Sequence, residues 1–195
     1  MELALPGGHP DLRVAVLVFD LLDGTRRVTL GRMSALQLPY TKNCFVCGAH
    51  NPHGLHLRFR REGNEVLTDF VAQPHHAGFR DIVHGGIIAT ALDEAMFWAA
   101  ATTTKRFCLA AELTVRFLQK VSVGQTLQII AALDADRGRL WESRAELRDD
   151  SGTIYARATC KQVPLDAAAM RHAAGDFLPD PATAEGMQLF ADLGQ

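Results

Sequence analysis

Hydrophobic and polar residues alternate along several stretches of the chain and predict most of its strands. Leucine or phenylalanine occupies every second position of residues 55–59, between histidine and arginine, which is the pattern of a strand with one buried face. A turn at Glu62-Gly63-Asn64 and a second apolar stretch at 66–72 predict a second strand. Residues 73–83 then read as a loop rich in histidine and glycine.

A different pattern begins at Gly85 and continues to about Thr103. This segment is apolar on nearly every side when it is placed on a helix, and a helix of that kind is buried all round. Its one strongly polar break is Asp93-Glu94. We therefore predict a long central helix that carries two carboxylates.

Strand patterns return after this helix. They cover residues 108–119, 126–133, 140–147 and 153–163, with turns at 136–138 and 149–152. Residues 165–174 and 182–193 predict two C-terminal helices. Two strands, one buried helix and a meander of strands indicate an antiparallel sheet with a helix held against it, in the α+β class.

The first part of the chain is open to two interpretations. Asp23-Gly24 lies between apolar runs, which fits a hairpin within residues 12–33, and a short helix that ends at Gly24 fits nearly as well. Residues 38–51 have the composition of a loop.

Composition narrows the classes of function. A chain of 195 residues, 48% of them hydrophobic, can form one sizeable core, and a formal net charge of -2 offers no basic field for nucleic acid. The start of the chain lacks a signal-peptide pattern, and no apolar run approaches the roughly 18 residues of a membrane span. Four cysteines do not form a dense secreted framework. We expect a cytoplasmic protein that binds neither nucleic acid nor membrane.

The predicted helix begins with two glycines, Gly85 and Gly86, which leave backbone N–H groups open to a ligand. The positive end of the helix dipole favours a developing oxyanion there. On its own, this pair also fits a tight loop that enters a helix. Asp93 and Glu94 favour a functional interpretation, because carboxylates in a buried helix are costly unless they are hydrogen-bonded or line a cleft. A narrow solvent-facing stripe that includes Thr90 is the alternative.

The spacing of these groups adds a constraint. Gly85 and Asp93 are eight residues apart, which is about 12 Å along a helix axis and roughly 80° around it. An oxyanion donor and a general base must both lie near one reacting centre. If both act, we expect the glycine to come from one subunit and the aspartate from its partner.

Four segments carry a family resemblance: HGGIIATALDE at 84–94, GFRDIV at 78–83, the leader CFVCG at 44–48 with its following NP and GL pairs, and ELTVRF at 112–117 with the Gly124 turn. They are similar to the hotdog-fold thioesterases of the phenylacetic-acid-pathway (PaaI-like) type. The similarity covers about residues 44–164.

The resemblance implies a hotdog domain at 41–164, in which an antiparallel sheet wraps a long helix, with extensions at 1–40 and 165–195. It implies an acyl- or aryl-CoA thioesterase that releases free acid and coenzyme A, uses no cofactor, and forms homodimers or dimers of dimers. Carried over by position, the Gly85 N–H polarises the thioester carbonyl, Asp93 acts as general base or nucleophile, and His84 orients the loop or contacts the carbonyl.

Further site residues are expected around this centre. Glu94 is the second catalytic carboxylate, and Gly86 is a substrate contact. His76, next to His75, is expected to line the acyl tunnel, and Arg116 and Lys120 to meet the phosphates of coenzyme A. Plain solvent exposure is the alternative for these three side chains.

Two departures from the family weaken the polar lining of the site. Ala77-Gly78 stand where glutamine is frequent, and Ala110 stands where threonine or serine is frequent. A third departure is Lys120, at a position where proline is common. The first two leave room for a non-catalytic acyl-CoA-binding sensor on the same fold. A hotdog dehydratase fits less well, because the helix has no histidine.

Cysteine and histidine recur at every third position in the leader, at residues 44, 47, 50, 53 and 56. Zinc binds both residue types tetrahedrally. However, a strand that begins near Gly54 would carry His56 away from the loop, and the leader resemblance explains Cys44 and Cys47 without metal. We therefore favour a structural turn and predict no metal site.

Overall fold

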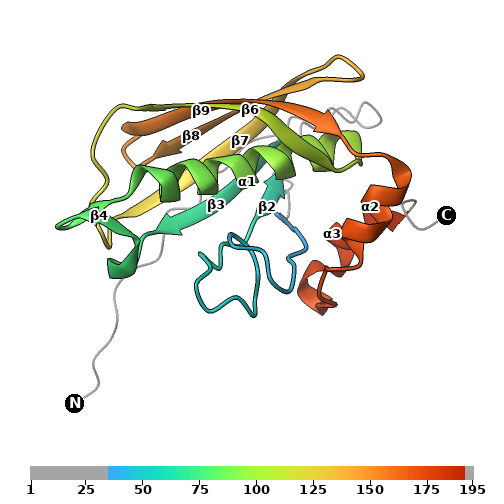
Figure 1. Ribbon diagram of the computed structural model, residues 1–195, viewed down its shortest axis with the longest axis horizontal. Helices are drawn as coiled ribbons and strands as arrows, with labels where there is room; N and C mark the ends of the chain where they lie inside the picture. The colour runs from blue at the N-terminus through green and yellow to red at the C-terminus, as the bar shows by residue number, and fades with distance from the viewer. Residues whose placement is uncertain (1–34, 192–195) are drawn as a thin grey trace, which may run out of the picture. The chain divides into compact units, whose positions relative to one another are not determined.

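The computed structural model describes residues 35–191, so the alternatives weighed for residues 12–33 lie outside the described residues. A seven-stranded antiparallel sheet carries the fold, in the order β1-β2-β3-β7-β8-β9-β6 (Figure 1). Its strands are β1 Leu36–Gln37, β2 Arg60–Glu62, β3 Glu65–Val71, β6 Cys108–Phe117, β7 Thr126–Asp136, β8 Trp141–Arg148 and β9 Ile154–Pro164.

The long helix α1, Gly85–Thr104, lies along one face of this sheet (Figure 1). It contacts β3, β6, β7, β8 and β9, and ten of its twenty residues are buried. The predicted central helix and the α+β class are therefore confirmed. Turns at 136–138 and 149–152 join β7 to β8 and β8 to β9, and Gly138 and Gly152 supply the positive φ that these turns need.

The segment at 54–59 differs from its prediction as a regular strand. Its side chains alternate in burial as expected, with Leu57 and Phe59 buried, but regular strand pairing begins only at Arg60. His56 has a φ of 52°, which interrupts the extended backbone. The Leu55 and Leu57 N–H groups donate to carbonyls of the leader loop, at Phe45 and Val46, over 2.8 and 2.9 Å. The segment thus pairs with the leader instead of continuing β2.

The segment at 73–83 also contains more structure than the predicted loop. It forms the 3-10 turn η1, Pro74–His76, followed by the small hairpin of β4, Ala77–Phe79, and β5, Ile82–Val83. This hairpin leads directly into α1 (Figure 1). No helix among the described residues is long and apolar enough to cross a bilayer.

The C-terminal segment packs on the end of α1 through aromatic rings. Trp98 and Phe107 meet Phe177 and Phe190 at centroid distances of 5.0–6.2 Å. The helix α2, Ala167–Ala174, agrees with its prediction. The helix predicted at 182–193 is wrong in extent: the chain forms η2, Pro181–Thr183, and the short α3, Ala184–Gln188.

A close backbone contact explains this shorter helix. Gly186 lies so near β1 that an added Cβ would stand 2.2 Å from the Gln37 carbonyl oxygen, and Phe190 turns inward to the aromatic cluster. The segment follows these contacts instead of one long helix axis.

Replacing Trp98 with alanine is expected to lower the free energy of unfolding by about 3–5 kcal/mol, because the indole is 1% exposed and fills the junction between α1 and the C-terminal segment. Equilibrium urea unfolding measures the loss. Arg139→Ala, at an exposed hairpin position, is the control and is expected to change stability by less than about 0.5 kcal/mol. Equal unfolding midpoints for Trp98→Ala and wild type would contradict this packing role.

Candidate active site

The start of α1 is held by the His84 side chain. Its Nδ1 accepts a hydrogen bond from the Gly86 N–H at 2.9 Å, and its own backbone N–H donates to the His76 carbonyl at 2.9 Å. An added Cβ at Gly86 or Gly78 would stand about 3 Å from His84. The glycines therefore leave room for the imidazole, which caps the helix. The Gly86 N–H already donates to His84 and is not free to bind a substrate. The expected substrate contact at Gly86 therefore stays a prediction, and it would have to use another atom of this residue.

The Gly85 N–H is the open donor at this helix start. It has no acceptor among the described residues. Phe117, on the edge strand β6, lies beside it: a Cβ added at Gly85 would stand 3.1 Å from the phenyl ring. The donor therefore lies next to the exposed edge of the sheet, at the level of the end of β6.

Asp93 lies in the middle of α1 and points toward the sheet. The Cys160 thiol, on β9, donates to its Oδ1 at 3.9 Å. Burial raises the pKa of this carboxyl, and the Cys160 thiol opposes the rise. No lysine or arginine of the described residues forms an ion pair with Asp93. A half-buried carboxylate without a cationic partner is poised to accept a proton.

Glu94 points away from Asp93, toward the leader loop. The Cys44 thiol lies 3.8 and 3.9 Å from its two carboxylate oxygens. Burial, and next the negative charge of Cys44, raise the pKa of Glu94 to about 8. The two neighbouring carboxylates therefore belong to different surroundings, and the structure does not bring Glu94 together with Asp93.

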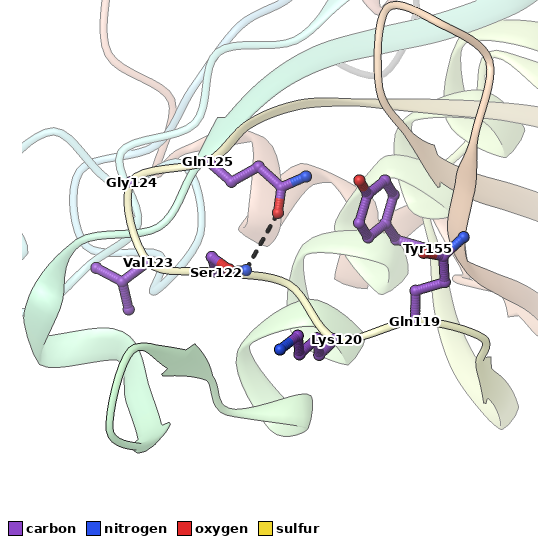
Figure 2. A pocket seen from close by; sticks show the side chains of 7 residues that line it. All are labelled: Gln119, Lys120, Ser122, Val123, Gly124, Gln125 and Tyr155. Atoms are coloured by element: carbon purple, nitrogen blue, oxygen red, sulfur yellow. Dashed lines mark hydrogen bonds between the residues drawn. The ribbon is translucent and has the colours of Figure 1, made fainter.

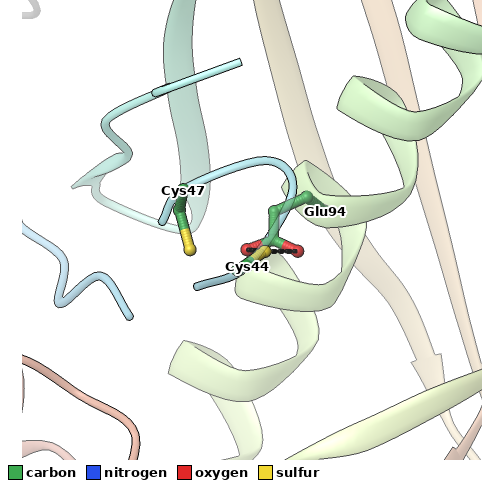
Figure 3. A group of neighbouring side chains, drawn as sticks. All are labelled: Cys44, Cys47 and Glu94. Atoms are coloured by element: carbon green, nitrogen blue, oxygen red, sulfur yellow. Dashed lines mark hydrogen bonds between the residues drawn. The ribbon is translucent and has the colours of Figure 1, made fainter. Parts of the chain in front are cut away.

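The leader loop and Glu94 form a group that could hold a metal ion (Figure 3). The sulfur atoms of Cys44 and Cys47 and a Glu94 oxygen all lie within 4.8 Å of one another. The Cys47 thiol lowers the pKa of Cys44, and the same hydrogen bond raises that of Cys47. The three leader histidines are exposed and lie outside this group.

His76 is buried in the turn before the helix. Its Nδ1 accepts from the Gln73 N–H at 3.0 Å, while its Nε2 has no partner among the described residues. Burial lowers its pKa, with a smaller contribution from His75. His76 therefore shapes the loop that holds His84, and its expected role in an acyl tunnel stays a prediction.

Lys120 lines an open pocket of about 580 Å³, together with Gln119, Ser122, Val123, Gly124, Gln125 and Tyr155 (Figure 2). The loop that forms this pocket is tied to the approach of α1. The Val83 N–H donates to the Val121 carbonyl at 2.9 Å, and the Val123 N–H donates to the Asp81 carbonyl at 3.1 Å. Lys120 therefore belongs to the loop that is hydrogen-bonded to the segment leading into His84.

Arg116 is placed differently from the rest of the predicted site. Along β6, Leu113 and Phe117 pair with Cys160 and Ala156, which are buried on the α1 side of the sheet. Arg116 falls between them and pairs with Arg157, so it lies on the opposite face. The structure does not bring it together with Asp93.

Two neighbours of the site were missed in the sequence, Cys160 beside Asp93 and Phe117 beside Gly85. The alternation along residues 153–163 puts Cys160 on the buried face with its even-numbered neighbours. That pattern could have placed Cys160 against the helix, but not against a particular helix residue.

Comparisons with known proteins bear on the fold and on the sequence of residues 81–156. Residues 81–156 match the family model of the thioesterase superfamily. No curated protein sequence matches the chain. A solved thioesterase superfamily protein is 18% identical, with a TM-score of 0.58, and the match covers 63% of this chain and 63% of that one. The chain therefore spans less than two thirds of the length of that relative.

Two further solved structures share the fold. The Escherichia coli PaaI protein of the phenylacetic acid degradation operon is 17% identical, with 57% of this chain and 81% of that chain covered and a TM-score of 0.53. A Streptococcus mutans protein solved with acetyl-CoA is 16% identical, with 56% and 88% covered and a TM-score of 0.52. The fold is therefore the hotdog fold, as the resemblance to PaaI-like thioesterases implied, and residues 81–156 match the thioesterase-superfamily model, in agreement with that resemblance.

Proposed function

We propose that the protein is an acyl-CoA thioesterase that hydrolyses an acyl- or aryl-CoA at a site shared by two chains. The observation that carries the proposal is the pair of groups on α1. Within residues 35–191, the Gly85 N–H has no acceptor, and the half-buried Asp93 carboxylate has the Cys160 thiol beside it but no cationic partner. Eight residues of helix separate them by about 12 Å, so they do not meet on one substrate within one chain.

The proposed reaction uses each group in one role. The Gly85 N–H donates to the thioester oxygen and stabilises the oxyanion of the tetrahedral intermediate. Asp93 takes a proton from a water molecule while the oxygen of that water bonds to the carbonyl carbon of the thioester. The carbon–sulfur bond then breaks, the free acid forms, and the proton leaves Asp93 for the thiolate of coenzyme A.

The edge strand β6 supports a two-chain site. It ends the sheet, so one of its sides has no strand partner among the described residues, and most of its residues are exposed. Leu113 and Phe117 expose apolar side chains on the α1 side. A long apolar edge strand needs a cover, and a second copy of β6 in antiparallel pairing would continue the sheet.

The register of such a pairing follows from contacts within one chain. Asp93 lies beside Cys160, which pairs with Leu113, while Gly85 lies beside Phe117. A two-fold axis near Val115 would place Phe117 of each chain opposite Leu113 of the other. The open N–H of one helix then comes to the level of the carboxylate of the other helix. The pairing that covers the edge also completes the site.

Replacing Leu113 with lysine is expected to convert the dimer into monomers, because it puts a charge at the centre of this apolar interface. Thr159→Lys is the matched control, since it adds the same charge on the opposite, exposed face of the neighbouring strand. Sedimentation equilibrium measures the mass, and thiol release measures activity. A monomeric Leu113→Lys variant with full activity would rule out the shared site.

Free-thiol release from short, medium, long and aromatic acyl-CoAs tests the function directly. Turnover of at least one member of the panel is expected. The alternative of a non-catalytic acyl-CoA sensor is favoured by Ala77 and Ala110, which leave the site with few polar groups. Tight binding of acyl-CoA in calorimetry, without thiol release from any member, would support the sensor.

We propose that the phosphates of coenzyme A bind near Lys120, because the pocket that Lys120 lines adjoins the segment leading into the helix start.

A further inference from the structure

We propose that Cys44, Cys47 and Glu94 bind a zinc ion that ties the leader loop at 44–48 to helix α1. The three side chains come from two elements that are far apart in the sequence, and they converge on one point (Figure 3). Two thiolates and a carboxylate are a ligand set that zinc accepts, with water in the fourth position. This site is separate from the proposed hydrolytic centre, because Glu94 and Asp93 point to different sides of α1.

The spacing of the ligand atoms fits the ion. In a tetrahedral site with bonds of about 2.3 Å to sulfur and about 2.1 Å to oxygen, a sulfur and an oxygen ligand are roughly 3.6 Å apart. The Cys44 sulfur lies 3.8 and 3.9 Å from the Glu94 oxygens, and all three ligand atoms lie within 4.8 Å of one another. The three ligand atoms can therefore bind one zinc ion if they move by a few tenths of an ångström to about 1 Å.

The leader loop already holds Cys44 as a ligand. The Val46 N–H donates to the Cys44 sulfur at 3.2 Å, and the Gly48 N–H donates to the Cys44 carbonyl at 2.9 Å. A Cβ at Gly48 would stand 2.3 Å from that carbonyl oxygen, so the turn closes this tightly only with glycine. An N–H that points at sulfur favours the thiolate, which is the form that binds metal.

Charge gives a second, independent reason. No lysine or arginine of residues 35–191 forms an ion pair with Glu94. Arg58 reaches the leader loop, but it donates to the Cys47 carbonyl oxygen at 2.8 Å and stacks on the Tyr40 ring. Within residues 35–191, these three ligands thus meet without a lysine or arginine paired to them. A zinc ion would replace their protons and bring the balancing positive charge to the cluster.

The remaining cysteines provide an internal control. Cys160 contacts Asp93, and Cys108 is buried on β6 beside Trp141 and Ala100. Neither belongs to the group of converging ligands. A thiol removed at Cys108 therefore leaves the proposed zinc site complete.

The test uses the full chain, purified under reducing conditions without chelator. Elemental analysis is expected to give one zinc per chain for wild type and for Cys108→Ala. Less than 0.1 zinc per chain is expected for Cys44→Ser and Cys47→Ser, and at least tenfold weaker cobalt binding for Glu94→Gln. Cobalt that replaces zinc is expected to give a sulfur-to-metal charge-transfer band in wild type, and circular dichroism checks that each variant folds.

A second measurement needs no variant. In wild type, zinc is expected to slow alkylation of two thiols at least tenfold, and mass spectrometry is expected to locate them at Cys44 and Cys47. Reduced wild type that takes up neither zinc nor cobalt at micromolar concentration would overturn the proposal. Zinc that slows the alkylation of Cys108 or Cys160 instead of Cys44 and Cys47 would also overturn it. A Cys44–Cys47 disulfide in a chain that binds no metal when reduced would assign the pair to redox chemistry instead.

Discussion

Replacing Asp93 with asparagine is expected to lower kcat for acyl-CoA hydrolysis by about 10²–10⁴-fold, which is the usual contribution of a general base. Asparagine keeps the size and polarity of the side chain but does not accept the proton of the attacking water. Because the amide also fits beside Cys160, the melting temperature and the affinity for a non-hydrolysable acyl-CoA analogue are expected to change little.

Steady-state thiol release measures this effect, and Asp69→Asn, at an exposed position on β3, is the control. The control is expected to hydrolyse the same substrate at the wild-type rate. An Asp93→Asn variant with kcat within threefold of wild type would remove Asp93 from the mechanism. A single turnover in ¹⁸O-labelled water separates the two chemical roles, since only direct attack by Asp93 leaves label in its carboxylate.

Replacing Gly85 with proline is expected to lower kcat by about 10²–10³-fold, because it deletes the N–H that we propose as the oxyanion donor. Proline is well tolerated at the first position of a helix, and His84, with φ -63° and ψ 131°, already has the conformation that precedes proline. Gly85→Ala is the matched control. It adds a Cβ near the flexible Phe117 ring but keeps the N–H, so most of the activity is expected to remain.

Mixing the two inactive variants tests whether the site is shared. In a hybrid dimer of Asp93→Asn with Gly85→Pro, one of the two sites contains both an intact Gly85 and an intact Asp93. Random exchange of subunits at equal amounts is expected to restore about one quarter of wild-type activity. A site built within one chain predicts no recovery, so mixtures that stay inactive after verified exchange would contradict the two-chain proposal.

The sequence alone determined the elements that local patterns encode. The apolar run from Gly85 is long and has a single polar break, so it could only be a buried helix that carries Asp93 and Glu94. Alternation with glycine turns between the strands specified β7, β8 and β9. The motif around His84 led to the resemblance that the fold and the family model confirm.

Local patterns failed where distant contacts decided the conformation. The alternation at 54–59 predicted a strand, but pairing with the leader loop and the positive φ of His56 removed its regularity. The predicted helix at 182–193 is shortened for the same kind of reason, since Gly186 and Phe190 follow contacts with β1 and with the aromatic cluster.

Only the tertiary structure separated the two carboxylates. In the sequence Asp93 and Glu94 are adjacent and chemically similar, and both were expected to be catalytic. Neighbouring residues on a helix point about 100° apart, so Asp93 reaches Cys160 on the sheet while Glu94 reaches Cys44 in the leader. The cysteine and histidine repeat offered only nearby histidines as partners of Cys44 and Cys47, whereas packing brings Glu94 to them from fifty residues away. A helix pattern fixes which residues are buried, but only the layers packed around it decide what each buried carboxylate meets.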